Sequence, residues 1–230
     1  MKRRIAAILF ILSSILLTSG CGMQEENPLY IRTEQKSYKE IAEILKQYEI
    51  DGITEELIEE FETSYSETPQ EFELNKTAML LTALGRGDYD YEEWTWQPYS
   101  NGVYSFDVEV YDEGKMYTNF LVGISALDQD ELDFRNIQED TSGVNWEKGT
   151  GKRTVTFEWN GNTYCLEAKA QNDWFDMKVA KALNKIIMEN SNDKRLFYTD
   201  DGYQECIIFY RDKEWADSFQ KETGLVLSEF

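Results

Sequence analysis

Carboxylates are the side chains best able to do chemistry in this sequence, because 44 of its 230 residues are Asp or Glu and none is His. Histidine is the commonest metal ligand and the usual general base near neutral pH. Its absence excludes Ser–His–Asp catalysis, Cys–His catalysis and ordinary zinc enzymes. A pair of carboxylates can still hydrolyse a glycosidic bond, so a carboxylate-dependent glycoside hydrolase remains an alternative. No acidic residue lies in a recognisable catalytic motif, and we predict no catalytic residue and no enzyme.

The densest acidic stretch runs from Glu49 to Asn75, where ten acidic residues occur without a Lys or Arg. Within a predicted helix of this stretch, Glu55, Glu59 and Glu62 lie opposite the apolar face. Such a surface repels nucleic acid and attracts cationic partners. These glutamates are therefore candidate contacts for a basic protein or peptide. The alternative is that the charge only keeps an exported protein soluble.

Aromatic residues gather beside acids in the segment YEEWTWQPY, residues 91–99. Trp94 and Trp96 share one face of a strand by alternation. Aromatic rings beside carboxylates can stack on sugars or hold cations. The two tryptophans are thus candidate partner-binding residues, and the alternative is that they pack at the edge of a core.

Three loop segments resemble ligand-binding motifs without matching them. DQDELD (residues 128–133) and DYDYEE (residues 88–93) alternate carboxylates as calcium loops do. They lack the glycine and the final glutamate of the EF-hand. EKGTGKR (residues 147–153) lacks the first glycine and the Ser or Thr of a phosphate-binding loop. The sequence therefore predicts two acidic turns and a loop before a strand, with no metal and no cofactor.

The three cysteines of the chain fall in different contexts. Cys165 and Cys206 both lie in predicted strands. An exported protein can oxidise such a pair to a disulfide, or keep both as free thiols. Cys21 instead follows an apolar run, in the segment LLTSGCG.

The first 20 residues have the layout of an export signal. Lys2, Arg3 and Arg4 precede 13 apolar or small residues, from Ile5 to Leu17. This run is too short to span a bilayer and suits the hydrophobic region of a signal peptide.

Small residues then lead directly into Cys21, and this arrangement resembles the lipobox of bacterial lipoproteins. The resemblance covers residues 1–21 only. It implies cleavage before Cys21, attachment of diacylglycerol to its thiol, and anchoring on the extracytoplasmic face of the cell membrane. A signal peptide without lipid and an uncut N-terminal anchor are the alternatives. Residues 1–20 are then the signal peptide, residues 21–35 a tether and residues 36–230 the exported domain.

Removing residues 1–20 takes away three basic and no acidic residues, which leaves 20 basic and 44 acidic residues and a net charge of −24. Most of this charge lies in the first part of the exported chain. Residues 21–145 contain 8 basic and 29 acidic residues, whereas residues 146–230 contain 12 and 15. The first part of the domain should therefore dominate its electrostatic field.

The elements that position these residues divide into a helical part, about 36–85, and a sheet part, about 95–230. In the helical part, apolar residues repeat at helical spacing between capping and breaking residues. The predicted helices are Ser37–Gln47, opened by a capping box, a second one capped by Thr54, and Phe72–Leu84, ended by Gly85.

Beyond Val103 the apolar residues alternate, which predicts strands. The predicted hairpins are Val103–Tyr111 with Lys115–Ala126, Thr154–Trp159 with Thr163–Lys169, and Leu196–Thr199 with Tyr203–Tyr210. The second hairpin turns at Asn160-Gly161, a strong two-residue turn signal. Two predicted helices, Asp173–Asn190 and Lys213–Thr223, follow the second and third hairpins. We therefore predict an α+β fold, with an antiparallel sheet of hairpins packed against these two helices.

These observations predict a non-enzymatic, membrane-anchored binding or interaction module of the cell envelope. One alternative is an immunity or sequestration lipoprotein that captures a cationic toxin or peptide. The other is the glycoside hydrolase named above.

Overall fold

The computed structural model describes residues 36–65, 75–90, 95–191 and 193–230. It has an α+β fold, as the sequence predicts. Cys21, the predicted signal peptide, the predicted tether and Trp94 lie outside the described residues.

The helical part begins as predicted. Helix α2 (Tyr38–Gln47) is opened by the capping box of Ser37 and Glu40. Helix α3 (Glu55–Tyr65) follows, and the Leu57 amide donates to the Thr54 hydroxyl at its start. Each cap satisfies amides that a helix leaves unpaired at its first turn.

Helix α4 (Lys76–Arg86) differs from the prediction at both ends, because Asn75 caps it and Gly87 ends it. Gly85 is not a terminator. It lies where α4 crosses the central sheet, and a Cβ added there would stand 2.6 Å from the Ser105 amide nitrogen. The glycine therefore permits a close approach of helix and strand.

The central sheet has the strand order β10-β8-β9-β3 and is antiparallel. Its strands are β3 (Tyr104–Asp107), β8 (Arg195–Asp200), β9 (Glu205–Arg211) and β10 (Ser228–Glu229). The β8–β9 hairpin confirms the third predicted hairpin. Residues 205–210 of β9 are all buried, which shows that this sheet is covered on both faces.

A second antiparallel sheet is built on the Asn160-Gly161 hairpin, as predicted. Asn160 and Gly161 both have positive φ, at 50° and 75°. The long strands on either side pair with each other, and two shorter strands pair with the first of them. The strands are β4 (Arg135–Asp140), β5 (Val144–Asn145), β6 (Thr150–Trp159) and β7 (Asn162–Gln171).

The strand predicted over Lys115–Ala126 is wrong, because this segment forms a short 3-10 helix, η2 (Glu113–Lys115), and helix α5 (Met116–Ser125). The Asp112 carboxylate caps the turn by accepting from the Lys115 amide. Met116, Tyr117, Phe120, Leu121 and Ile124 are buried on it. Their spacing is helical, and the few polar residues of α5, Thr118, Asn119 and Ser125, lie on its partly exposed side.

The remaining elements follow the prediction more closely. Helix α6 (Met177–Asn190) begins at its cap Asp176, later than predicted. Helix α7 (Lys213–Thr223) has the predicted bounds and ends at Gly224 in the left-handed conformation. Two short strands, β1 (Asp88–Asp90) and β2 (Thr95–Gln97), form a separate hairpin that the sequence did not predict.

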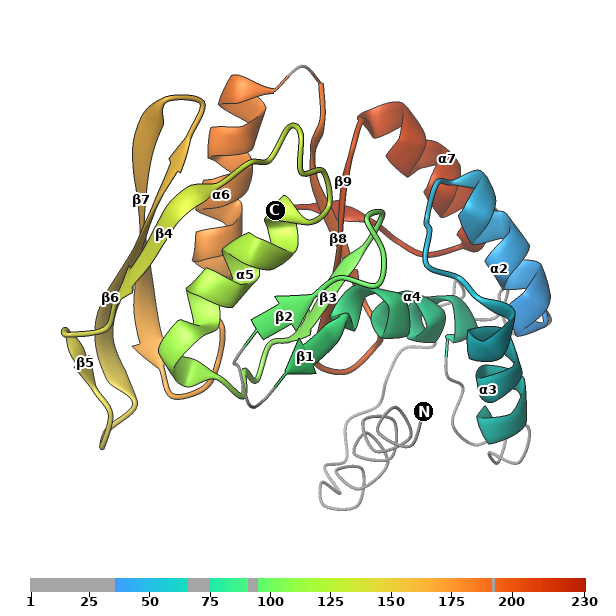
Figure 1. Cartoon of the computed structure of the whole chain (residues 1–230), viewed down its shortest axis with the longest axis horizontal. Helices are drawn as coiled ribbons and strands as arrows, with labels where there is room; N and C mark the ends of the chain where they lie inside the picture. The colour runs from blue at the N-terminus through green and yellow to red at the C-terminus, as the bar shows by residue number, and fades with distance from the viewer. Residues whose placement is uncertain (1–35, 66–74, 91–94, 192) are drawn as a thin grey trace, which may run out of the picture.

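These elements form four layers (Figure 1). The second sheet lies at one end, α5 and α6 lie between the two sheets, and α2, α4 and α7 cover the other face of the central sheet. Helices therefore pack on both faces of the central sheet. The prediction of one sheet is wrong, because the strands of the predicted hairpins belong to two different sheets. One core cluster joins the two sheets through α5 and α6, and the other joins the central sheet to the N-terminal helices and α7.

Candidate functional site

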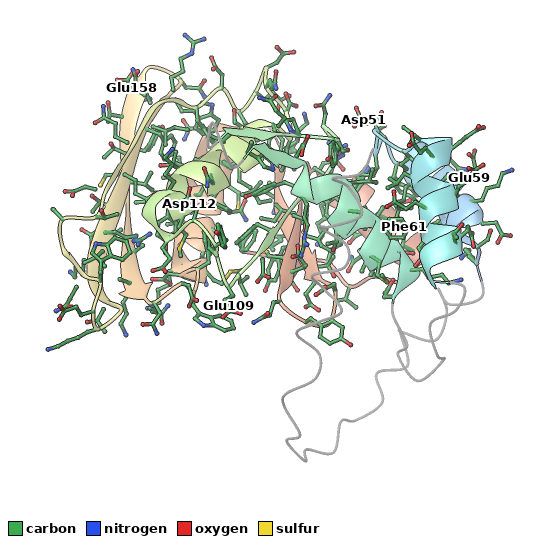
Figure 2. The ribbon with its side chains drawn as sticks, turned by 60° about the horizontal axis from the view of Figure 1, so that its bottom comes forward. Asp51, Glu59, Phe61, Glu109, Asp112 and Glu158 are labelled. Atoms are coloured by element: carbon green, nitrogen blue, oxygen red, sulfur yellow. The ribbon has the colours of Figure 1, made fainter. Side chains whose placement is uncertain are left out.

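The predicted anionic strip is present on α3. Glu55, Glu56 and Glu59 are exposed, and no ion pair joins them to another described residue. Figure 2 shows Glu59 pointing away from the molecule, while Phe61 of the same helix points inward and is 3% exposed. The amphipathic pattern thus directs the glutamates to solvent.

Glu62 is also exposed but has a structural contact. Its Oε1 atom accepts a hydrogen bond of 2.8 Å from the backbone amide of Tyr38. That amide is one of those left unpaired at the start of α2. Glu62 therefore connects α3 to α2. The glutamates of α3 available to a partner are then Glu55, Glu56 and Glu59, instead of the predicted Glu55, Glu59 and Glu62.

Trp96 contributes to packing, in agreement with the alternative that the sequence left open. Its Nε1–H donates to the Arg86 carbonyl over 2.5 Å, and its ring meets Tyr104 edge-on, with centroids 5.5 Å apart. The Nε1–H group is therefore bonded within the fold, and the ring packs against the core that joins the two sheets.

Cys165 and Cys206 are both free, in agreement with the second of the two alternatives that the sequence left open. Cys165 is exposed on β7 and Cys206 is buried on β9, in two different sheets with α6 between them. Burial raises the pKa of the Cys206 thiol and keeps it protonated.

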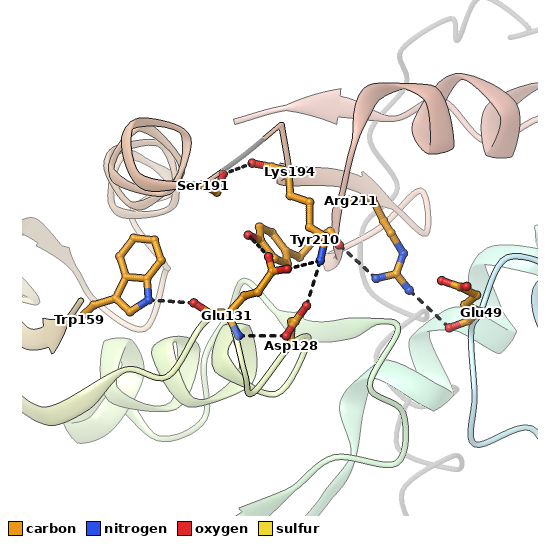
Figure 3. A network of polar contacts seen from close by, with 8 residues as sticks. All are labelled: Glu49, Asp128, Glu131, Trp159, Ser191, Lys194, Tyr210 and Arg211. Carbon is orange, nitrogen blue, oxygen red and sulfur yellow. Dashed lines mark hydrogen bonds and ion pairs between the residues drawn. The ribbon is translucent and has the colours of Figure 1, made fainter.

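The acidic turn at residues 128–133 is held by a lysine. Lys194 Nζ lies 3.0 Å from Asp128 Oδ2 and 2.9 Å from Glu131 Oε1 (Figure 3). Within the described residues, no group of three or more His, Cys, Asp or Glu side chains is placed to hold a metal ion. The segment at residues 88–93 lies partly outside the described residues.

Glu131 also connects the two sheets (Figure 3). Its Oε2 accepts from the Tyr210 hydroxyl of β9, and its carbonyl accepts from Trp159 Nε1 of β6, each over 2.9 Å. An open hollow of about 370 Å³ lies beside this network, lined by Asn101 and residues 126–130. The charged residues that line it, Asp128 and Asp130, are acidic.

Only the first three residues of EKGTGKR form the predicted turn, because strand β6 begins at Thr150, earlier than the predicted Thr154. Arg153 of this strand forms a buried ion pair. Arg153 Nη1 lies 3.0 Å from Glu139 Oε1, with 2% and 3% of the two side chains exposed. The other Glu139 oxygen accepts from the amides of Tyr117 and Thr118, at the start of α5. No local signal in the sequence predicts this pair, which joins the second sheet to α5.

A cluster of carboxylates at one end of the central sheet was not predicted either. Asp107 and Glu205 are paired directly across β3 and β9. Glu205 forms an ion pair with Arg86 of α4 and accepts a 2.5 Å hydrogen bond from the Ser105 hydroxyl. Asp201 lies at the turn before β9 and accepts from the amides of Tyr203 and Glu205.

Burial sets the protonation of this cluster. It raises the pKa of Asp107 to about 6, with a further contribution from Glu205 and an opposing one from Arg86. Burial also raises the pKa of Asp201. For Arg86, burial acts against the charged form, but Glu205 raises the pKa above its usual value. One guanidinium thus faces three carboxylates, and the cluster has an excess of negative charge.

No protein-family model matches this chain, and no curated protein or solved structure matches it. Within the described part of the chain, none of the helices combines the length and apolar character needed to cross a bilayer.

Proposed function

We propose that this protein is an exported lipoprotein, anchored through Cys21, whose domain binds a basic protein or peptide without catalysing a reaction. The observation that carries the proposal is the row of exposed glutamates on α3, Glu55, Glu56 and Glu59, without a counter-charge among the described residues. Capture of a cationic toxin at the membrane surface is one form of this function.

Electrostatics gives this surface a physical use. Exposed like charges raise the local potential and attract an oppositely charged partner over roughly a Debye length, about 8 Å at physiological salt. Arg153 and Arg86 already neutralise the buried Glu139 and Glu205. The charge available to a partner is therefore on the surface, and association should weaken as salt rises.

The experiment is a pull-down of basic proteins from the native envelope by the full-length protein in detergent, at low and high salt. The test variant carries Glu55→Gln, Glu56→Gln and Glu59→Gln. The control carries Glu167→Gln, Glu214→Gln and Glu222→Gln, which remove the same charge from exposed positions elsewhere. We expect the test variant alone to lose most of the captured protein. Equal capture by both variants would show that the α3 glutamates are not the binding surface. If the protein captures no basic partner in a salt-sensitive way, the proposed function is wrong.

The anchor has its own test. Cys21→Ala should abolish labelling with a radioactive or clickable fatty acid, because the thiol is the attachment point that the lipobox resemblance implies. A variant that still takes up the label would contradict the lipoprotein assignment.

One observation favours the hydrolase as a second candidate. Asp107, with its pKa raised to about 6, faces a second carboxylate across the strand pair, and such a group can serve as a general acid. The test is hydrolysis of a panel of fluorogenic glycosides by the wild-type protein and by Asp107→Asn. Turnover that the substitution abolishes would support this candidate, and equal rates would exclude Asp107 as its acid.

A further inference from the structure

Two large aromatic side chains are unusually exposed near the carboxylate cluster. Trp174 is 43% exposed and Tyr203 is 61% exposed. Exposed aromatic residues beside charged ones are typical of interaction surfaces. Both residues lie on segments that flank the stretch after β3, residues 108–110.

Backbone hydrogen bonds fix this arrangement. The Val110 amide donates to the Asp173 carbonyl over 2.7 Å, and the Phe175 amide donates to the Val108 carbonyl over 2.8 Å. Glu109 and Trp174 are thereby paired across an antiparallel bridge. These two hydrogen bonds are made by the neighbouring residues, one on each side of Glu109 and Trp174. Glu109 and Trp174 are therefore a non-hydrogen-bonded pair of the antiparallel ladder, the type of pair in which the two side chains lie closest together.

The other side of the stretch is fixed to the start of β9. The Val108 amide donates to the Gln204 carbonyl over 2.9 Å, and Gln204 Nε2 donates to Glu109 Oε2 over 3.2 Å. Tyr203 precedes Gln204 in the chain, and its amide donates to Asp201 Oδ1. Among the described residues, no bond is made to Glu109 Oε1. Glu109 is labelled in Figure 2, where it lies at the margin of the ribbon.

We propose that Trp174 and Glu109 form a recognition point for an arginine side chain of the basic partner. This inference rests on the proposed function and identifies the chemical group that the partner presents. The guanidinium stacks on the Trp174 indole and donates to Glu109 Oε1.

Arginine suits this surface better than lysine. A planar guanidinium can stack on an aromatic ring and pair with a carboxylate at the same time, whereas an ammonium group is a strongly hydrated point charge. The excess negative charge of the neighbouring cluster, from Asp107 and Asp201, adds long-range attraction for either cation. The aromatic contact therefore favours arginine over lysine, whereas the negative charge raises the affinity for both.

The probes are end-capped hexa-arginine and hexa-lysine peptides, titrated by calorimetry or anisotropy into the full-length protein in detergent. Trp174→Ala should weaken hexa-arginine binding about fivefold, and hexa-lysine binding less, because a cation–π contact is worth about 1 kcal/mol. Glu109→Gln should weaken both about threefold and reduce the salt dependence. The Trp174→Ala/Glu109→Gln double variant should lose less than the product of the two single effects.

Matched controls are available in the chain. Trp146→Ala removes another exposed tryptophan, 50% exposed, and Glu167→Gln removes another exposed carboxylate. Both should leave peptide binding unchanged, and a thermal melt of each variant reports on folding.

Two results would overturn the inference, and they separate it from the proposed function. If hexa-arginine binds and the Trp174 and Glu109 variants bind it equally well, the recognition point is wrong but the basic partner stands. If the wild-type protein binds neither peptide and captures no basic protein from the envelope, both proposals fail.

Discussion

At the scale of single residues, the buried charges of this protein stabilise particular contacts between layers. Arg153 of β6 pairs with Glu139 of β4, and its Cζ atom lies 5.6 Å from the centroid of the Tyr117 ring and 5.3 Å from that of Trp146. A buried ion pair adds little net stability compared with apolar residues, but the loss of one member leaves a charge without compensation.

Arg153→Met should therefore lower the free energy of unfolding by about 3 kcal/mol, because Glu139 stays buried without its partner. The Arg153→Met/Glu139→Gln double variant should recover much of this loss. Urea unfolding of the three proteins measures both effects. A loss under about 0.5 kcal/mol in the single variant would show that the pair is dispensable.

Asp107 gives a prediction about pH. Its pKa of about 6 lies above the ordinary value of 3.8, so the folded protein binds this proton more tightly than the unfolded chain does. The group thus favours folding at acid pH, and this contribution is lost as pH rises from about 4 to 6. Asp107→Asn should then stabilise the protein by about 1 kcal/mol at pH 7, after allowance for solvent screening.

The difference between Asp107→Asn and the wild type should shrink toward pH 4. Urea unfolding at both pH values tests the sign. A variant that is less stable than the wild type at pH 7 would show that the carboxylate is favourable in the fold.

At the scale of elements, the sequence predicted the turns and helix ends that are set by residues next to them in the chain. The turn residues Asn160 and Gly161 fixed one hairpin, and Asp212 and Gly224 mark the ends of α7. Helix α5 was missed because most of its residues are apolar, and only Thr118, Asn119 and Ser125 mark its exposed side. The carboxylate cluster was missed because Ser105 and Glu205 are 100 positions apart and meet only through the β3–β9 pairing.

Gly161 and Gly85 are needed for different reasons, the first for its left-handed backbone conformation and the second for a close approach of helix and strand. Gly161→Ala meets no atom within 4 Å, so it should cost only the strain of a left-handed conformation, about 1 kcal/mol. Gly85→Ala is compatible with the helix but drives a Cβ into the backbone of β3, and should cost more than about 2 kcal/mol. Thermal or urea unfolding ranks the two variants, and the reverse order would contradict the packing of α4 on β3.

At the scale of the whole molecule, the net charge of −21 should oppose the compact state. The melting temperature should therefore rise as NaCl increases from about 10 mM to about 200 mM, where the Debye length shortens to below about 10 Å. The Glu55→Gln, Glu56→Gln and Glu59→Gln triple variant should show a smaller rise. A melting temperature that does not change with salt would show that the exposed acids do not repel one another appreciably.

Strand β9 belongs to both core clusters, since Ile208 and Tyr210 face one and Ile207 and Phe209 face the other. Loss of either cluster would expose one side of this strand to water, so neither cluster can open by itself without disturbing the other. The amides of β9 should consequently be among the slowest in the protein to exchange with deuterium, and they should exchange only when the entire domain opens. A partner held at the start of β9 would slow that exchange across all four layers at once.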